Sequence, residues 1–318
     1  MSNLKIEKKS EKMKVAFLTL GCKVNYYETE KMAERLAESG FEIVDFSVGA
    51  DIYVVNTCTV TNIADRKSRQ MLSRARKKNP DAFIVACGCY VDAAGKNHLI
   101  KNADVKVDDL IRQGVIDIAI GNEDKDNIAN ILSSVIGKKS PFTGESKSVY
   151  KRERTRAFLK IQDGCNQFCT YCLIPYVRGG GTLHSAPKED VLKEVRRLAK
   201  NGVKEVVLNG IHLSSYGVDT LGAGGFLELE GKPLLSLIEE VASIEGISRI
   251  RLGSLEPRII TESFAVTLSR IDKVCPHFHL SMQSGSDETL KRMNRHYTSE
   301  TYKKKVGQIG RASCRERV

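Results

Sequence analysis

The sequence lacks the features of a membrane protein and of a secreted protein. No apolar run reaches the roughly 18 residues that a membrane-spanning helix needs. The first residues, MSNLKIEKKSEKMK, are charged and contain no apolar core of the kind that a signal peptide requires. The sequence also has no internal repeat and no low-complexity segment. Hydrophobic and charged contents of 41% and 28% are typical of a globular protein, which we expect in the cytoplasm without membrane association.

Acidic residues are in the minority. Lysine and arginine number 50 against 39 aspartates and glutamates, so the formal net charge is +11. A basic balance favours a polyanionic partner such as a nucleic acid, although many basic proteins bind none.

The first half of the chain alternates strands and helices. KVAFLTLG and AFIVACG are apolar runs typical of strands buried on both faces, and IYVVNT, FEIVDF and DIAIG are further strand candidates. Helices are expected over Glu28–Glu38, about Asn62–Lys78 and about Asp126–Ile136. Repeated strand–helix units predict an α/β fold with an open parallel sheet.

A polar, basic stretch at 138–156 predicts a linker. A second series of strands follows from Ala157, namely AFLKIQ, EVVLNG, SRIRLGS and HFHLS, with helices near 188–200, 234–243, 261–271 and 287–293. Four such units are consistent with an incomplete (β/α) barrel. We therefore expect a disordered amino terminus over 1–13, a parallel-sheet domain over 14–137, the linker, and a partial barrel over 157–308.

The last ten residues, IGRASCRERV from Ile309, show no helix or strand periodicity. They can be back-translated to the read-through of a common sequencing adapter. We therefore expect an artefactual tail over 309–318, to be set aside in fold reasoning.

Three of the nine cysteines directly follow predicted strands: Cys22, Cys58 and Cys89. In open α/β sheets, ligands bind outside the carboxyl ends of the strands, so these thiols are expected to converge on one spot. In a reducing cytoplasm such cysteines are metal ligands or catalysts more often than disulfides. Three unrelated buried cysteines are the alternative. We interpret Cys87, two residues before Cys89, and Cys275, which precedes a strand, as core residues.

The second half carries a triplet spaced C-x3-C-x2-C: Cys165, Cys169 and Cys172, on the loop after AFLKIQDG. Barrel active sites are built from the loops after the strands. A structural zinc site has four closed ligands, and no fourth cysteine or near histidine completes this set. Three thiolates on a four-iron cluster would instead leave one iron open for a substrate or cofactor.

With this cysteine triplet the sequence resembles the radical S-adenosylmethionine (SAM) enzymes, and more closely their methylthiotransferase family. The matching motifs run from about Lys14 to Tyr302 and are LGCKVNYYETE, VVNTCTVT, ACGCY, GCNQFCTYCLIPYVRG, LNGIHLSSYG, RLGSLEP and HLSMQSGSDETLKRMNRHY. The family pairs a flavodoxin-like domain bearing three cysteines with a radical SAM barrel and a small RNA-binding barrel called TRAM. LGCKVN and CTYCLIPYVRG look like the branch that methylthiolates threonylcarbamoyl-adenosine at position 37, next to the tRNA anticodon.

The resemblance implies SAM and two 4Fe-4S clusters as cofactors. One cluster, on Cys165, Cys169 and Cys172, would bind SAM at its open iron, and cleavage of SAM would give a radical that removes hydrogen from carbon 2 of the adenine. The second, on Cys22, Cys58 and Cys89, would carry the methylated sulfur to that carbon. The resemblance also implies tRNA as partner, an electron donor such as flavodoxin or ferredoxin, and a monomer.

The resemblance implies further residues that bind SAM. The alternative interpretation is that they are ordinary polar residues of loops. They lie at strand ends or in the MNRHY motif, and they are Asn209, Gly210, Ser254, Glu256, Gln283 and Arg295.

The chain also departs from the family pattern. GGTLHSAP replaces the usual arginine-rich stretch after YVRG, and no TRAM segment is present. Four alternatives stay open: methylthiolation of isopentenyl-adenosine in tRNA, methylthiolation of a ribosomal protein, a cobalamin-dependent radical SAM enzyme, and a non-catalytic, metal-stabilised RNA-binding module. Against the third, the D-x-H-x-x-G motif common in such enzymes is missing.

Overall fold

The computed structural model describes residues 12–95, 106–136, 156–218 and 229–313 of the chain. The chain divides into two compact units, one formed by Met1–Gly21 and Glu28–Lys151 and the other by Cys22–Tyr27 and Arg152–Val318. The predicted disordered terminus and linker lie almost wholly outside the described residues, so the domain boundaries placed there stay predictions. Within the described part, no helix is long and apolar enough to cross a membrane.

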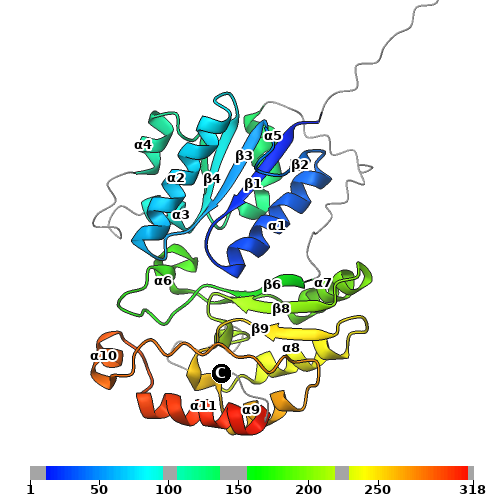
Figure 1. Ribbon diagram of the computed structural model, residues 1–318, viewed down its shortest axis with the longest axis vertical. Coiled ribbons are helices and arrows are strands. Elements are labelled where there is room, and N and C mark those ends of the chain that lie inside the picture. The colour runs from blue at the N-terminus through cyan, green and yellow to red at the C-terminus, as the bar shows by residue number, and fades with distance from the viewer. Residues whose placement is uncertain (1–11, 96–105, 137–155, 219–228, 314–318) are drawn as a thin grey trace, which may run out of the picture. The chain divides into compact units, whose positions relative to one another are not determined.

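The first unit is built on a five-stranded parallel sheet (Figure 1). Its strand order is β2-β1-β3-β4-β5, the order found in flavodoxin-like folds. The strands are β1 (Lys14–Thr19), β2 (Glu42–Val44), β3 (Ile52–Thr57), β4 (Phe83–Gly88) and β5 (Ile118–Ile120). The helices are α1 (Lys23–Glu38), α2 (Asn62–Lys78), α3 (Cys89–Gly95), α4 (Val107–Arg112), the short η1 (Lys125–Asn127) and α5 (Ile128–Val135). The predicted α/β class and open parallel sheet are confirmed.

Alternate strand residues explain why this sheet is covered on both faces. Val15 and Val54 pack in one apolar cluster with residues of α1 and α5. Their neighbours Ala16 and Val55 point to the other face and pack with residues of α2, α3 and α4. Because both sets are apolar, the strands are continuous apolar runs, as the sequence indicated.

The helix ends show where the sequence pattern was sufficient. α2 has the predicted bounds, because the Thr61 side chain accepts a hydrogen bond from the Ala64 N–H at 3.1 Å and caps the first turn. α1 begins at Lys23, earlier than the predicted start at Glu28, and its first turn is closed by a bond from the Tyr26 N–H to the Cys22 carbonyl. After α1, Gly40 adopts a left-handed φ of 90° and ends the helix.

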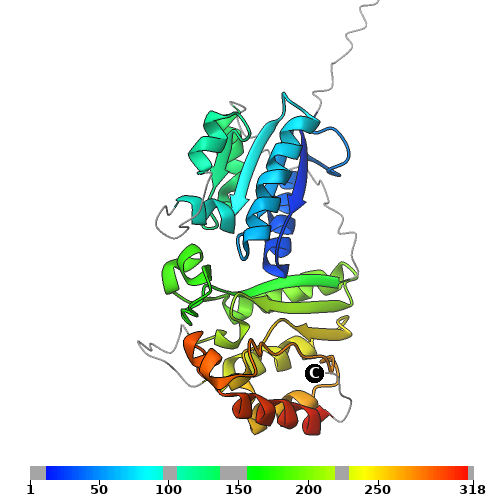
Figure 2. The same ribbon diagram turned by 60° about the vertical axis from the view of Figure 1, so that its left-hand side comes forward.

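The second unit contains a half-barrel sheet with order β7-β6-β8-β9. β6 (Arg156–Asp163), β8 (Glu205–Gly210) and β9 (Arg249–Leu252) are parallel, and the short β7 (His184–Ser185) pairs antiparallel with β6. The helices are α6 (Ile174–Val177), η2 (Gly179–Gly181), α7 (Lys188–Lys200), η3 (Leu213–Ser215), α8 (Lys232–Ser243), η5 (Pro257–Ile259), α9 (Glu262–Ser269), α10 (Asp287–Arg292) and α11 (Ser299–Ser313). In both ribbon views α8, α9 and α11 lie on one side of this sheet (Figures 1 and 2).

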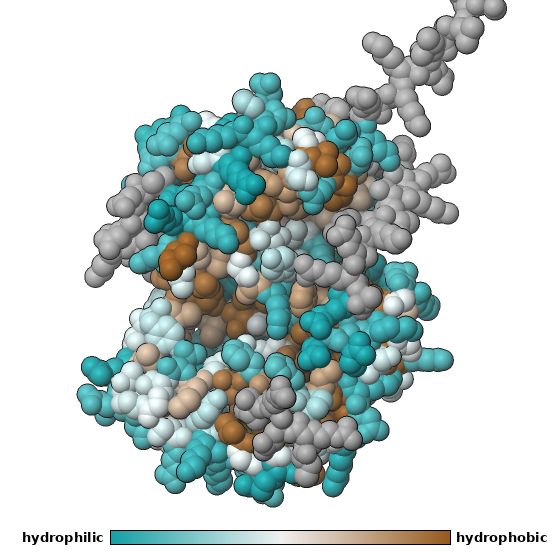
Figure 3. Space-filling model, viewed as in Figure 1, coloured by the Kyte–Doolittle hydropathy of each residue, from teal (hydrophilic) through white to brown (hydrophobic). Residues whose placement is uncertain are grey.

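One apolar core joins these helices to the sheet. Leu159 and Ile161 of β6 and Leu208 of β8 contribute to it, together with residues of α7, α8 and α9. The opposite sheet face carries Gln162 and Asn209, which are polar and buried. Phe158 and Val207 on the same face are apolar, so the polar side chains gather near the carboxyl ends of the strands, where the site forms. Hydrophilic side chains prevail at the outer rim of the space-filling view (Figure 3).

Two expectations for the second unit need correction. HFHLS was predicted as a strand, but it forms only an isolated bridge between Leu280 and Leu255, because β9 already ends at Leu252 and the pairing does not continue. The expected tail from Ile309 lacks the predicted irregularity, since α11 continues to Ser313. Ile309 is only 1% exposed and packs in the same core as Val306, so the start of the tail contributes to the fold.

Candidate functional site

The C-x3-C-x2-C loop begins directly at the carboxyl end of β6. Gly164 turns the chain out of the sheet with φ +74°, and a Cβ there would lie 2.0 Å from the Thr182 carbonyl oxygen, so only glycine fits. Cys165 is buried, whereas Cys169 and Cys172 are partly exposed. The position agrees with the prediction that the triplet lies at a strand exit, where barrel enzymes build their sites.

The side chain of Gln162 connects this loop to the exit of β8. Its Nε2 donates to the carbonyls of Asp163 at 2.7 Å and Gly164 at 2.8 Å, and its Oε1 accepts from the His212 N–H at 2.7 Å. Gly210 allows this contact, because a Cβ there would approach the Gln162 side chain to 2.9 Å. The role of Gly210 in the structure is thus to admit Gln162.

A second connection comes from the exit of β9. The buried Glu256 carboxylate accepts from Arg258 Nε at 2.9 Å, and Arg258 Nη2 donates to Gln167 Oε1 at 2.8 Å. The Glu256 N–H donates to Ser214 Oγ at 2.9 Å. A chain of carboxylate, guanidinium and amide groups therefore fixes the loop between Cys165 and Cys169.

The turn after α10 makes a third connection. Asn294 Nδ2 donates to the carbonyls of Gln167 at 3.2 Å and Phe168 at 3.1 Å, and the Thr170 N–H donates to the Met293 carbonyl at 3.2 Å. Arg295 Nη1 lies 3.3 Å from Cys169 Sγ, in position to donate to the sulfur. The MNRHY motif therefore contacts the cysteine loop directly.

The three thiols lie close enough to influence one another electrostatically. Burial raises the pKa of Cys165 to about 11, and the neighbouring Cys172 and Cys169 add to the rise. The pKa of Cys172 is also raised, first by burial. Burial lowers the pKa of Arg295, but the hydrogen bond to Cys169 and the interactions with Cys169 and Tyr297 together outweigh this, so the net shift is upward and the guanidinium stays charged. A cation held beside clustered sulfurs suits a site that gathers negative charge.

His212 is buried at the edge of the site. Burial, assisted by Arg258 and Arg295, lowers its pKa to about 3, so the ring is neutral. Its Nδ1 lies 2.7 Å from Ser215 Oγ, and its buried Nε2 has no hydrogen-bond partner among the described residues.

The donor set of the loop fits an iron–sulfur cluster. The three thiols are soft donors, which iron–sulfur clusters prefer, and the Arg295 cation lies beside one of them, Cys169. The thiols are not arranged as a finished metal site, however: no group of three His, Cys, Asp or Glu side chains in the described part stands close enough to hold an ion. The ligand roles of Cys165, Cys169 and Cys172 stay predictions.

The other predicted SAM contacts differ in their relation to this loop. Glu256 and Arg295 belong to its hydrogen-bond network, and Asn209 is buried, with its Nδ2 donating to the Val207 carbonyl at 2.9 Å. Ser254 is exposed and its Oγ pairs with His279 Nδ1 at 2.7 Å, while Gln283 is exposed with a left-handed φ of 69°. Neither of these two has a hydrogen bond to the loop.

Sequence reasoning missed several residues that hold the loop in place. They are polar side chains next to residues that were singled out, and they are Gln162, Gln167, His212, Arg258 and Asn294. His212 lies inside LNGIHLSSYG and Asn294 inside MNRHY, so the motifs contained the signal but not the contacts.

In the first unit, Cys58 directly follows β3 and Cys89 directly follows β4, and these two neighbouring strands end side by side. Thr57 and Gly88, which precede them, are register partners of β3 and β4, and both cysteines are buried. Ser68 of α2 fixes Cys58 by accepting from its N–H at 3.2 Å and donating to its carbonyl at 2.9 Å. The two strand-exit positions predicted for these cysteines are therefore observed.

The remaining cysteines of the amino-terminal motifs behave differently. Cys87 is fully buried in the apolar cluster that contains residues of α1 and α5, and burial raises its pKa to about 12, which suits the core interpretation. Cys22 follows β1 and precedes α1, as predicted from its strand, and is exposed. A shared cluster on Cys22, Cys58 and Cys89 stays a prediction.

Comparison with known families gives two matches. Residues 14–111 match the family described as "Uncharacterized protein family UPF0004", and residues 159–315 match the Radical SAM superfamily. The first match covers most of the first strand–helix series, up to residue 111, and the second match covers the second series.

Curated relatives extend over most of the chain. The threonylcarbamoyladenosine tRNA methylthiotransferase MtaB of Bacillus subtilis (strain 168) is 38% identical over 310 residues, covering 94% of this chain and 64% of the relative. The protein of the same name from Aquifex aeolicus (strain VF5) is 39% identical, covering 93% and 69%. A tRNA-2-methylthio-N(6)-dimethylallyladenosine synthase of Clostridium botulinum (strain Okra / Type B1) is 32% identical, covering 92% and 63%. The chain thus spans between 63% and 69% of the length of these relatives.

Among solved structures, the radical S-adenosylmethionine methyltransferase TsrM from Kitasatospora setae, with tryptophan substrate and a SAM analog bound, superposes with a TM-score of 0.62. Identity is 14%, and the match covers 95% of this chain and 66% of that one. At this identity the likeness shows a shared fold alone.

Proposed function

Because this chain belongs to the radical SAM methylthiotransferase family, we propose that it adds a methylthio group to carbon 2 of threonylcarbamoyl-adenosine at position 37 of tRNA. Two relatives named for threonylcarbamoyladenosine are 38% and 39% identical to it, and a third, from Thermotoga maritima, is 31% identical, against 32% for the relative named for dimethylallyladenosine. The two highest identities therefore support the threonylcarbamoyl substrate. The proposal extends the relatives' named activity to a chain that spans about two thirds of their length.

The observation that carries the proposal is the cysteine loop after β6, held from three sides. Gln162, Arg258 and Asn294 each hydrogen-bond to it from a different element. Such fixation is what a site needs when three thiols must accept one cofactor in a defined position.

A 4Fe-4S cluster on Cys165, Cys169 and Cys172, with SAM at its open iron, would supply a carbon radical able to remove hydrogen from an adenine carbon. The chain's own residues prepare that position. Arg295 places a positive charge against Cys169, and neutral His212 adds none of its own to the site. Cys165 is buried, which keeps water from one of the sulfurs.

The remaining parts of the proposal are inferred from membership of the methylthiotransferase family. A second cluster on Cys22, Cys58 and Cys89 would provide the sulfur, and Asn209, Gly210, Ser254, Glu256 and Gln283 are proposed to line the SAM site. An electron donor such as flavodoxin or ferredoxin, a monomeric state and a cytoplasmic location complete it.

The proposal is tested on tRNA nucleosides. The chain is expressed in a bacterium that lacks its own methylthiotransferases, and the tRNA is digested and analysed by mass spectrometry. We expect 2-methylthio-threonylcarbamoyl-adenosine with the unaltered chain and with Cys275→Ala, and none with Cys169→Ala. The isopentenyl derivative in its place, or a methylthio group on a ribosomal protein, would establish one of the alternatives. Unmodified tRNA and protein, together with a failure of the purified chain to cleave SAM, would contradict the family activity for this chain.

A further inference from the structure

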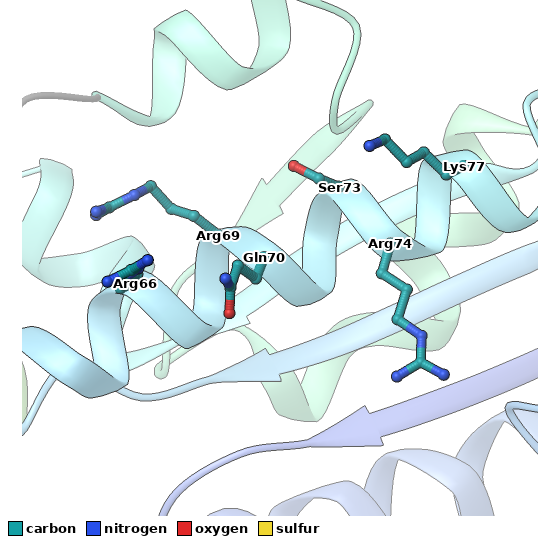
Figure 4. A pocket seen from close by; sticks show the side chains of 6 residues that line it. All are labelled: Arg66, Arg69, Gln70, Ser73, Arg74 and Lys77. Carbon is teal, nitrogen blue, oxygen red and sulfur yellow. The ribbon is translucent and has the colours of Figure 1, made fainter.

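Helix α2 carries an unusual excess of positive charge. Its seventeen residues, NIADRKSRQMLSRARKK, include seven basic residues and one acidic residue. Arg66, Arg69, Gln70, Ser73, Arg74 and Lys77 line a surface pocket of about 380 Å³. Figure 4 shows that all six side chains extend from α2 itself, and none of them is acidic. We call these six residues the α2 basic face.

Part of the charge on α2 has a structural use. Arg76 pairs with Asp117 at 2.6 Å and also donates to the carbonyls of Pro80 and Ala82, so it fastens the end of the helix. Arg69 hydrogen-bonds to Tyr90 of α3, and this contact holds the Arg69 side chain against the protein. These two arginines therefore need no partner outside the chain.

Arg66, Arg74 and Lys77 are different. All three are exposed, and none has a carboxylate at ion-pair distance within the part of the chain that the structure describes. They lie at helical spacings along one side, and the distance from the first to the last is about 16 Å at 1.5 Å per residue. The surface therefore presents a row of cations that the fold leaves uncompensated.

The stability of α2 does not account for this row. The helix buries Ser68, Leu72 and Ala75 on its other side, so Arg66 and Arg74 contribute no packing. Like charges three residues apart, such as Arg74 and Lys77, destabilise an isolated helix. The macrodipole favours cations only in the last turn, which accounts for Lys77 but for neither arginine.

We propose that the α2 basic face binds the phosphate backbone of tRNA, an inference that rests on the proposed function. Arg66, Arg74 and Lys77 flank Gln70 and Ser73, whose neutral donors also bond to phosphate and sugar oxygens. A membrane surface is a poorer match, because a membrane-bound helix exposes its apolar face, whereas that of α2 is buried against the sheet. Contacts of this kind position the RNA without reading its sequence.

The test compares two triple variants that remove the same charge. The first is Arg66→Gln, Arg74→Gln, Lys77→Gln on the α2 basic face. The matched control is Lys193→Gln, Arg196→Gln, Lys200→Gln, three exposed cations of α7 without an ion pair in the described residues. Binding of the reconstituted chain to an unmodified tRNA transcript is followed by fluorescence anisotropy between 50 mM and 400 mM salt, roughly the range over which phosphate contacts are resolved.

The α2 variant is expected to lower the slope of log K against log salt by about 2 to 3, since each lost phosphate contact contributes about 0.7 to 0.9. That corresponds to roughly a 100-fold weaker affinity at 0.1 M salt. The α7 variant should bind like the unaltered chain. A charge-preserving variant, Arg66→Lys, Arg74→Lys, Lys77→Arg, should keep the slope, which guards against a loss caused by misfolding.

Four results would overturn the inference. They are an unchanged slope in the α2 variant, an equal loss in the α7 variant, displacement of tRNA by poly-glutamate as effective as by unlabelled RNA, and absence of tRNA binding by the unaltered chain. SAM cleavage measured without tRNA separates the proposals: if cleavage persists while binding is unaffected by the α2 variant, only the inference about α2 fails.

Discussion

Gln162 gives the sharpest test of how the cysteine loop is held. The change Gln162→Met keeps the side-chain length and removes three hydrogen bonds, two to carbonyls at the end of β6 and one from the His212 N–H. Gln162 is 1% exposed, so water cannot readily replace the lost partners. At about 1 kcal/mol for each bond, the free energy of unfolding of the second unit should fall by about 3 kcal/mol.

This loss is measured by urea unfolding. With an m-value of about 2 kcal/mol per molar urea, the midpoint should fall by about 1.5 M without a change in m. The control is Gln113→Met, an exposed glutamine whose replacement should change stability by less than about 0.5 kcal/mol. Iron content after reconstitution should fall in Gln162→Met, because the loop loses one of its three connections. A midpoint within about 0.3 M of the unaltered chain would refute the reasoning that Gln162 secures the loop.

Two further predictions concern stability. Glu205 is buried, which raises its pKa, but hydrogen bonds from Arg249 and Arg251 outweigh this and the net shift is downward. Its stabilisation is therefore present at neutral pH and lost as the pH falls through the lowered pKa. Glu205→Gln should lower the melting temperature at pH 7, and this effect should shrink steadily as the pH is lowered; an equal effect at all pH values would contradict this. Gly88 has φ +101°, and a Cβ would lie 2.6 Å from a carbonyl oxygen of β3, so Gly88→Ala should destabilise the first unit by about 2 to 4 kcal/mol. In Gly49→Ala the added Cβ meets no atom within 4 Å, so it should be nearly neutral in the same chemical denaturation, and equal effects of the two changes would exclude strain as the cause.

The fold was largely predictable because its strands are strong local signals. IYVVNT and EVVLNG match β3 and β8 residue for residue, since apolar runs buried on both faces need no partner to be recognised. HFHLS failed because a strand also needs a paired neighbour, and only Leu255 offers one. No helix was predicted over Ser299–Ser313, where α11 lies, because its apolar positions, such as Ile309, are few among basic residues.

Of the site, only the cysteines were predictable from the sequence. Thiol spacing marked Cys165, Cys169 and Cys172, because the chemistry of a cluster demands those residues. The residues that fix the loop, such as Gln162 and Arg258, are ordinary polar side chains whose role depends on contacts across 50 and 91 positions in sequence. Such contacts arise from tertiary packing and leave no local pattern.

The central claim is that the chain holds two iron–sulfur clusters on two separate cysteine sets. Iron and labile sulfide per chain after anaerobic reconstitution test it most directly. Three chains are compared: the unaltered one, one with Cys165, Cys169 and Cys172 changed to alanine, and one with Cys22, Cys58 and Cys89 changed to alanine. The account predicts about eight irons in the first and about four in each variant. A single cluster, lost completely when the first set is changed and retained when the second set is changed, would contradict it.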